Sequence, residues 1–422
     1  MQEEAHKITQ PLNTQKYLGN RGLIVFIALM NMFIPLSTDL YLPALPKMSA
    51  YFGSSSAVTN LTLSAFFIFY AFGILIWGPL SDKYGRKPIL TVGSLLYILS
   101  SICCALSTSV QLLIAARILQ GIGSGGITSV SVALIKDCFS GKKRETILAI
   151  TQSISGLAPM LAPILGAWIL LFTSWRGSFW TLTAIGAVNL VLTLLYRETL
   201  KENERYTGTL PGSLSRLFIV AKNKSFFIPA LIFSLSAVPF MGYIALSSYI
   251  YVDFFGLSEQ AYSYYFAANA LLSVSGPFLY VRYLSRANKK TLAAGCFLLT
   301  VLSGVLVMTV GTFAPLTFLL SFMLTSLSGA AIRPFSTNIL LEQQKGDTGS
   351  ASSLISTLFT VLGSVGMSLA SVPWGNMVVG LGAIITVFSA ISLIGWYAFL
   401  KSSIPCVGLK DTVLPFHENT LG

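Results

Sequence analysis

Long apolar segments recur along the whole chain and constrain its fold more than any other feature. Each is about 20 residues long, the length with which an α-helix crosses the hydrocarbon core of a bilayer. Inside a bilayer every backbone polar group needs an internal partner, which favours helices over open strands. We therefore expect an all-α integral membrane protein with twelve transmembrane helices. The expected spans are Leu23–Leu42, Val58–Leu80, Pro88–Leu106, Val110–Phe139, Thr146–Phe172, Phe179–Tyr196, Phe226–Val252, Ala261–Leu284, Leu292–Val310, Leu316–Leu341, Ser350–Val372 and Val378–Leu400.

Composition and charge placement agree with a membrane location. Only 10% of the residues are charged, whereas soluble domains carry roughly 25%. The net charge of +12 is concentrated in alternate loops, and the loops between them hold little beyond Lys47 and Arg176. Cytoplasmic loops carry such an excess of Lys and Arg, so we expect both termini in the cytoplasm and no nucleic-acid partner. Residues 1–20 are polar and lack an apolar core, so we expect no cleavable signal.

One polar stretch divides the chain. Residues 197–225 contain Gly, Pro, Lys and Arg without an apolar period, and six expected spans lie on either side of them. Equal halves are the pattern of a duplicated transporter fold. The sequence predicts a six-helix bundle over residues 1–196, a cytoplasmic linker over 197–225, and a second six-helix bundle with its tail over 226–422, the two bundles being pseudo-symmetric.

Enzyme chemistry finds little support in the sequence. The two histidines, His6 and His417, lie in the two tails, and the five cysteines show no metal-ligand spacing. An intramembrane enzyme needs a clustered catalytic set, and no phosphate-binding Gly-Lys-Ser/Thr motif is present for ATP. We expect neither catalytic residues, metal nor cofactor, and a transport process driven by the proton motive force.

Asp39 is the acid that we place well inside an expected span, near the end of the apolar run that begins at Leu23. A carboxylate in hydrocarbon costs several kcal/mol on most scales, roughly 2.5 kcal/mol or more. Such residues mark ion, proton or substrate pathways. The sequence therefore predicts that Asp39 binds a proton or a substrate.

The loop after the second expected span carries the sharpest motif. Residues 78–88 read Gly-Pro-Leu-Ser-Asp-Lys-Tyr-Gly-Arg-Lys-Pro. A short basic turn needs Lys and Arg but not Gly78, Asp82, Gly85 and Arg86 in this order. The loop resembles the signature loop between the second and third helices of the major facilitator superfamily. The resemblance implies that these four residues form a latch on the outward-facing state. The equivalent loop of the second half, residues 281–290, has no Asp or Gly.

Arg117 lies deep in the fourth expected span. Because an arginine stays charged, we expect it to face a cavity or a carboxylate. Counting about 1.5 Å per residue along each helix places Asp39 and Arg117 in the same outer half of the membrane. The segment resembles the fourth-helix motif of the superfamily, whose arginine is implicated in proton transfer.

The fifth expected span contains a run of small residues and prolines, residues 156–167. It resembles the fifth-helix motif of the antiporter branch, with alanines in place of some glycines. Small residues with proline let helices pack closely while bending. We interpret Gly156, Pro159, Pro163 and Gly166 as a helix-packing hinge, and ordinary close packing is the alternative.

Three further runs narrow the resemblance to the Bcr/CflA drug-resistance subfamily of proton antiporters. They are Ser37–Pro46, the pair Leu161–Gly166 and Trp175–Trp180, and Phe266–Ala270. The resemblance implies that Asp39 couples protons to cationic or neutral drugs. Some related exporters carry a second acid earlier in the first helix.

The position of that second acid corresponds here to Asn31, which cannot titrate. Burial favours a protonated carboxyl, whereas a nearby guanidinium favours the ionised form. Moving Arg117 relative to Asp39, or wetting the cavity, would therefore switch the carboxyl between holding and releasing a proton. Proton and drug would then compete for one cavity.

We expect the substrate cavity to include Asp39, Tyr41, Tyr243, Asn269 and Arg333. Aromatic side chains with hydroxyls suit flat amphiphiles through stacking and cation–π contact. Arg333 has two interpretations. It either reaches toward the cytoplasm, or it faces the cavity and favours anionic or zwitterionic substrates.

The sequence thus predicts a proton-coupled antiporter that exports amphiphilic drugs or antibiotics, such as phenicols or dyes. The alternative is a proton-coupled exporter or symporter of a sugar, amino acid or peptide on the same fold. Its partners would be a small-molecule substrate, protons and the lipid bilayer. We expect a monomer in the bacterial inner membrane.

Overall fold

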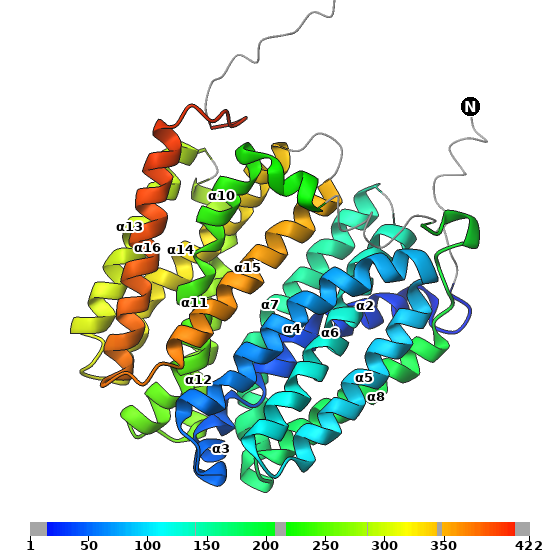
Figure 1. The fold of residues 1–422 in the computed structure, drawn as a ribbon, viewed down its shortest axis with the longest axis horizontal. Coiled ribbons are helices and arrows are strands. Elements are labelled where there is room, and N and C mark those ends of the chain that lie inside the picture. Colours follow the sequence, from blue (N-terminus) through cyan, green and yellow to red (C-terminus); the bar gives the residue numbers. More distant parts are fainter. Residues whose placement is uncertain (1–14, 140, 207–216, 285, 344–347, 410–422) are drawn as a thin grey trace, which may run out of the picture.

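The computed structural model describes residues 15–139, 141–206, 217–284, 286–343 and 348–409. Within them the chain forms helices joined by loops, without strands (Figure 1). Proceeding from the N-terminus, the helices of the first half pack into one lobe, which we call the N-lobe. Their bounds are α2 Gly19–Asp39, the 3₁₀ turn η1 Leu42–Ala44, α3 Leu45–Phe52, α4 Ser56–Tyr84, α5 Arg86–Leu106, α6 Val110–Cys138, α7 Gly141–Phe172, α8 Arg176–Leu195 and the 3₁₀ turn η2 Glu202–Glu204.

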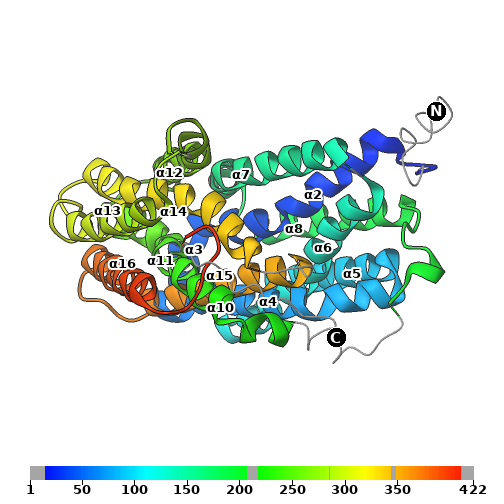
Figure 2. The same cartoon turned by 90° about the horizontal axis from the view of Figure 1, so that it is seen from above.

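The second half forms the C-lobe, which lies beside the N-lobe in both ribbon views (Figures 1 and 2). Its helices are α10 Lys224–Ser234, α11 Ala237–Ser248, the π-helical η3 Tyr249–Phe254, α12 Glu259–Leu279, the π-helical η4 Tyr280–Leu284, α13 Lys289–Thr309, α14 Pro315–Glu342, α15 Thr348–Ala370 and α16 Met377–Lys401. Within the described residues, ten helical segments are long and apolar enough to cross a membrane. The all-α membrane fold expected from the apolar runs is confirmed, and its helix bounds lie within a few residues of those expected.

The first span departs from expectation. We expected it to end at Leu42, but the chain stays mostly helical through η1 and α3, and the apolar segment runs from Arg21 to Phe52. Pro43 and Pro46 suggest a break, yet each occupies one of the first two positions of a new helical turn. A proline is tolerated there because that amide would lack a helical partner in any case. Asp39 is therefore the last residue of α2 in the middle of a longer span.

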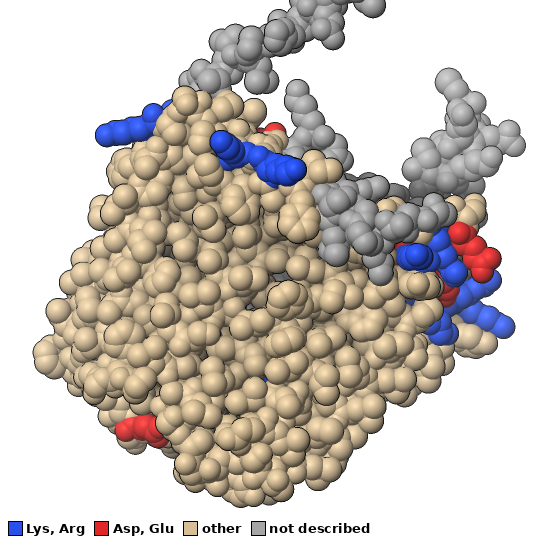
Figure 3. Space-filling model, viewed as in Figure 1, with Lys and Arg blue, Asp and Glu red and all other residues tan. Residues whose placement is uncertain are grey.

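Helices α4 and α6, and α5 and α8, pack together in the N-lobe, as α13 and α16, and α12 and α14, do in the C-lobe. The principal contacts between the lobes are α7 with α12 and α4 with α15. Lys and Arg gather toward the end of the molecule where α16 ends, as Figure 3 shows for one face. We call this the basic end and the other the opposite end.

The two lobes meet firmly at the opposite end. Lys47 of α3 pairs with Glu259 of α12, with 2.9 Å between Nζ and Oε1. The hydroxyls of Ser49 and Tyr249 lie 2.9 Å apart, and Gln260 donates to the carbonyl of Ala167 on α7. In the described residues, the polar contacts that we find between the lobes lie at this end.

The apolar cores show the same asymmetry. One cluster of buried residues joins Leu40, Tyr41 and Leu45 of the N-lobe to Tyr249 and Tyr262 of the C-lobe. A separate cluster at the basic end, which includes Phe226, Phe335 and Trp396, belongs to the C-lobe by itself. The lobes therefore share a core at the opposite end and keep separate cores at the basic end. The lobes are therefore closed against each other at one end.

Two glycines allow backbones to approach closely beside Asp39. A Cβ on Gly166 of α7 would overlap the carbonyl oxygen of Leu40, the residue after Asp39. A Cβ on Gly121 of α6 would press on the carbonyl oxygen of Phe66 in α4. Small residues are what such close helix crossings require in a membrane.

Replacing Gly166 by Leu should therefore destabilise the fold. Overpacking a tight contact costs about 1–3 kcal/mol, and here backbone rather than a flexible side chain blocks the new atoms. Gly295→Leu is the matched control, because nothing lies within 4 Å of a Cβ at Gly295. The measurement is the melting temperature of each purified protein in detergent. Equal melting temperatures for the two variants would contradict this packing.

Candidate functional site

Asp39 lies where α2 ends, buried between the two lobes. Only 3% of its surface is exposed. Thr38 donates a hydrogen bond of 2.8 Å to its Oδ1, and Gly166 packs against the backbone immediately after it. A buried carboxylate without a cationic partner is costly, and the cost falls when the group binds a proton.

Arg117 of α6 is fully buried close to the same helix end. It donates 3.0 Å to the carbonyl of Ser37 in α2, 3.3 Å to the carbonyl of Thr62 in α4, and a short hydrogen bond to Gln120. One guanidinium thus ties α2, α4 and α6 together at the level of Asp39.

Aromatic rings complete the surroundings of this guanidinium. Arg117 lies 4.8 Å from the ring centre of Tyr41, between α2 and η1, and 4.2 Å from that of Phe66 on α4. Electron-rich ring faces attract a cation by roughly 0.5–2 kcal/mol. Its Nη2 has no hydrogen-bond partner in the described part of the chain.

The expectation that Arg117 faces a cavity or a carboxylate was wrong for this conformation. No ion pair joins Asp39 to Arg117 among the described residues, and Arg117 is closed off from solvent. Carbonyl dipoles, an amide oxygen and ring faces share its charge instead. Residue type cannot signal such partners, because every residue carries a carbonyl.

The C-lobe covers Asp39 with aromatic side chains. Asp39 lies within electrostatic range of the Tyr262 hydroxyl on α12. Tyr262 is fully buried, and its hydroxyl lies 3.0 Å from that of Ser247 on α11. Asp39 therefore lies near a buried tyrosine of the opposite lobe.

Besides Asp39, three of the expected cavity residues are buried in this conformation. Tyr41 is fully buried in the N-lobe, with its hydroxyl 3.2 Å from Thr62. Tyr243 stacks on Phe322 with 4.1 Å between ring centres, and its hydroxyl makes no hydrogen bond of normal geometry. Asn269 accepts a 2.7 Å hydrogen bond from Ser326.

Arg333 differs from these residues because it is exposed. Its guanidinium lies 4.1 Å from the ring centre of Phe359 on α15. No acidic residue pairs with it in the described part of the chain.

The loop between α4 and α5 holds its arginine inside the N-lobe. Arg86 is buried and donates 2.8 Å to Asp137 at the end of α6, as well as to Ser81 and Asp82. Asp82 is more than half exposed and contacts Arg86. Asp137, which the sequence analysis missed, is the more buried partner. The signal in the sequence that could have identified Asp137 was an acidic residue in the last turn of an expected span, at the basic end.

The glycines of this loop have different surroundings. Gly85 has φ of 102°, and a Cβ there would press on Glu198, whose carboxylate accepts the amide of Lys87 at 2.9 Å. Such a backbone angle favours glycine. Gly78, in contrast, faces open space, with nothing within 4 Å of a Cβ.

The proposed hinge residues lie in one helix, α7, which contains Pro159 and Pro163 and also includes Gly156. Gly166 is the member whose contact is clear, because it packs on Leu40 beside the site. Ala162 and Ala167 are fully buried on this helix.

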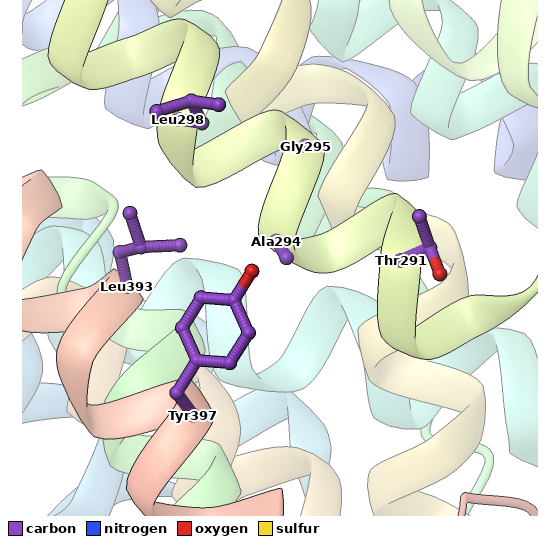
Figure 4. Close-up of a pocket in the computed structure, with 6 residues that line it drawn as sticks. All are labelled: Thr291, Ala294, Gly295, Leu298, Leu393 and Tyr397. Carbon is purple, nitrogen blue, oxygen red and sulfur yellow. The ribbon is translucent and has the colours of Figure 1, made fainter.

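A recess between α13 and α16 lies away from these residues (Figure 4). Its volume of about 280 Å³ falls at the lower limit of the range typical of ligand sites, roughly 300–1,000 Å³. Leu298 and Tyr397, which line it, are exposed apolar side chains on the outside of the lobe. We interpret it as a lipid-facing notch. In the described part of the chain, no cluster of His, Cys, Asp or Glu could hold a metal.

Comparison with known proteins places the chain in a family. Residues 24–367 match the model of the Major Facilitator Superfamily. The chain belongs to this superfamily, and it is a multi-pass membrane transporter, not an enzyme.

Its relatives include bacterial transporters. It is 28% identical over 388 residues to the uncharacterized MFS-type transporter YdgK of Bacillus subtilis, covering 91% of this chain and 96% of that protein. It is 32% identical over 297 residues to the multidrug resistance protein MdtL of Shewanella oneidensis, covering 68% and 74%.

Solved structures share the fold at lower identity. The human organic anion transporter MFSD10 superposes with a TM-score of 0.67 at 21% identity, covering 89% of this chain and 98% of that one. A D-xylose–proton symporter superposes with a TM-score of 0.71 at 15% identity, covering 92% and 98%.

The two acids around Arg86 should differ in importance. Breaking a buried pair costs about 3–5 kcal/mol because a charge is left without a partner, whereas an exposed pair contributes about 0–1 kcal/mol. Asp137→Asn should therefore lower the melting temperature of the purified protein clearly more than Asp82→Asn. A larger loss for Asp82→Asn would show that Asp82 is the principal partner of Arg86.

Proposed function

We propose that this chain is a proton-coupled antiporter of the Bcr/CflA type, which exports amphiphilic drugs or antibiotics by alternating access. The observation that carries the proposal is the burial of Asp39 at the end of α2, between the two lobes and without a cationic partner among the described residues. The resemblance to the multidrug resistance protein of Shewanella oneidensis supports drug cargo.

The basic end faces the cytoplasm in this proposal, because cytoplasmic loops are enriched in Lys and Arg. Lys83, Arg86 and Lys87 lie at this end, whereas Lys47 and Arg176 are basic residues of the opposite end. The polar contacts between the lobes then lie on the outer side. The conformation described here is accordingly inward-facing.

Proton coupling follows from what opening the outer side must do to Asp39. Here Asp39 is buried beside Tyr262 of the other lobe, and burial favours the protonated carboxyl. When the lobes separate at the outer side, Tyr262 moves away and water reaches the carboxyl. The carboxyl then exchanges its proton with the outside. In the inward-facing state, cargo that binds in the same space displaces the Asp39 proton, which leaves to the cytoplasm. After cargo has left on the outer side, the carboxylate takes up a proton from outside, so that one proton enters for each cargo molecule exported.

Arg117 keeps the acid in place during this exchange. Its hydrogen bonds to Ser37 and Thr62 hold the end of α2 against α4. The carbonyl that it binds belongs to Ser37, two residues before Asp39, so a rearrangement that brings the guanidinium to the carboxylate would favour proton release.

The loop between α4 and α5 acts as the inner latch. In the inward-facing state Gly78 faces open space and Asp82 is more than half exposed. Gly78 lies on α4, the helix that contacts α15 of the other lobe. Closing the inner side brings the surface of α4 around Gly78 against the C-lobe. Because glycine has no side chain, Gly78 permits the two helices to approach closely there.

The proton role of Asp39 makes a direct prediction. Asp39→Asn cannot release a proton, so proton-driven export should be lost, while exchange of labelled cargo across the membrane without a gradient persists. Asp253→Asn, which removes an exposed acid near the end of the span, should retain proton-driven export.

The assay uses the full-length protein in liposomes with an imposed pH gradient, and a resistance panel of phenicols and dyes identifies the cargo first. A cell that accumulates less of the labelled compound indicates export, and one that accumulates more indicates uptake. If Asp39→Asn still drives export from the pH gradient, the coupling scheme is wrong.

Orientation and conformation can be checked by labelling from each side. A cysteine at Ser352, exposed in the second turn of α15 from the basic end, should react with a membrane-impermeant maleimide from the cytoplasmic side. A cysteine at Lys47 should react from the outside. The five native cysteines are replaced first, and inverted and right-side-out vesicles are compared. The reverse pattern would contradict the assigned orientation.

A further inference from the structure

Arg333 is a charged side chain that the proton mechanism leaves without a role. It lies within α14, nine residues before the helix ends at Glu342. At 1.5 Å per residue, that is about 14 Å from the basic end of the helix, near the middle of a hydrocarbon core about 30 Å thick. Arg333 therefore lies at a depth where an unpaired cation is costly and marks a functional position.

The face of α14 on which Arg333 lies points away from lipid. Leu316 and Leu320, more than half exposed, mark the outer stripe of this helix. Arg333 follows Phe322 by three turns and Ser326 by two, and residues at these intervals share a face. Phe322 stacks on Tyr243, and Ser326 contacts Asn269, so this face is directed toward α11 and α12. Arg333 continues it toward the basic end.

The side chains of α15 that face this part of α14 become more exposed toward the basic end. Gly363 and Gly366 of α15 pack against Met241 and Val238 of α11. Phe359, one turn nearer the basic end, lies under the Arg333 guanidinium at 4.1 Å. Ser356 and Ser352, on the same stripe, are exposed. The stripe is thus packed at Gly363 and Gly366 and exposed at Ser352 and Ser356, and Arg333 contacts it at Phe359, between the two.

The chemistry of this position selects for negative charge. Arg333 is exposed in the described structure. Within the described residues no carboxylate pairs with it, and Glu342, the acid of its own helix, is nine residues away. Its planar guanidinium is held against an aromatic ring, which leaves its N–H edge free for a bidentate anion.

We infer that Arg333 with Phe359 forms an anion subsite in the space between the lobes, which binds a carboxylate, sulfonate or phosphate group carried by an aromatic or otherwise apolar cargo. Phe359 adds a flat apolar surface beside the charge. Asp39 handles the proton on the outer side of the same space, so the two charged groups have separate tasks. The inference names the substrate class for the proposed exporter and rests on that function only for the direction of transport.

Binding of a matched pair of probes tests the subsite without requiring transport. The probes are naphthalene-1-sulfonate and (1-naphthylmethyl)trimethylammonium, which share a ring system and differ in charge. The full-length protein is placed in nanodiscs of phosphatidylcholine, and affinity is measured by tryptophan fluorescence. Arg333→Gln should lose the guanidinium–sulfonate pair, so the affinity for the sulfonate should fall by about tenfold or more. The affinity for the ammonium probe should not fall.

Three controls sharpen this result. Arg282→Gln removes an exposed arginine that lies over Tyr283 outside the lobe interior, and should bind the sulfonate as the parent protein does. Arg333→Lys keeps the charge but not the fork geometry, and should lie between the two. Nanodiscs containing phosphatidylglycerol test whether lipid headgroups occupy the subsite, because such lipids would then compete with the sulfonate.

Undiminished sulfonate binding by folded Arg333→Gln would overturn the inference. So would competition by phosphatidylglycerol strong enough to abolish binding of the probe, since the site would then be a lipid site. Loss of proton-driven export without loss of Arg333-dependent binding would instead overturn the proposed antiport and leave the subsite standing. The two failures are therefore distinguishable.

Charge balance gives a second readout. Export of a monoanion against one proton moves two positive charges inward, whereas export of a monocation against one proton moves none. Export of the naphthalenesulfonate from liposomes should therefore accelerate when valinomycin and potassium set the potential in the direction that drives positive charge inward. Indifference of that export to the potential would contradict an anionic cargo.

Discussion

The structure depends on the burial of one guanidinium at the level of the helix break. Arg117 joins α2, α4 and α6 through carbonyl oxygens, Gln120 and two aromatic rings. A buried charge is tolerated when many partners share it. The same contacts fix the position of Ser37 and hence of Asp39, two residues later. The acid at the lobe interface is thus positioned by an arginine that does not pair with it.

The lobes are packed together at one end of the molecule only, and this asymmetry determines the environment of Asp39. At one end the lobes share a hydrophobic core and an ion pair between Lys47 and Glu259. At the other end the C-lobe has a core of its own. When the closed end opens and the other end closes, a side chain beside the closed end passes from a buried to a hydrated environment. Asp39 lies there, whereas Arg333 lies nearer the end at which the lobes diverge.

Much of this arrangement could be predicted from the sequence. The helix bounds followed from the apolar runs, since a membrane imposes the length of each span. The burial of Asp39 and the interior position of Arg117 followed from their places in such runs. These are local properties, because each follows from the residue types in one short stretch of the sequence.

Contacts between distant residues could not be predicted in the same way. The partners of Arg117 are largely backbone carbonyls, which no residue type reveals. Asp137 became the principal partner of Arg86 because α6 ends beside α5, a fact of packing. The helix beyond Asp39 was missed because Pro43 and Pro46 suggest a break, although each stands where a helical turn begins. Which end of the molecule is closed depends on the sum of contacts between the lobes.

The central claim is that Asp39 exchanges a proton for cargo, and infrared difference spectroscopy tests it most directly. A protonated carboxyl has a stretching band that a carboxylate lacks, and this band can be assigned by its absence in Asp39→Asn. Purified protein should lose the Asp39 carboxyl band when a cargo identified by the resistance panel binds, and regain it when the cargo is washed away. A band that persists unchanged through cargo binding would contradict the account.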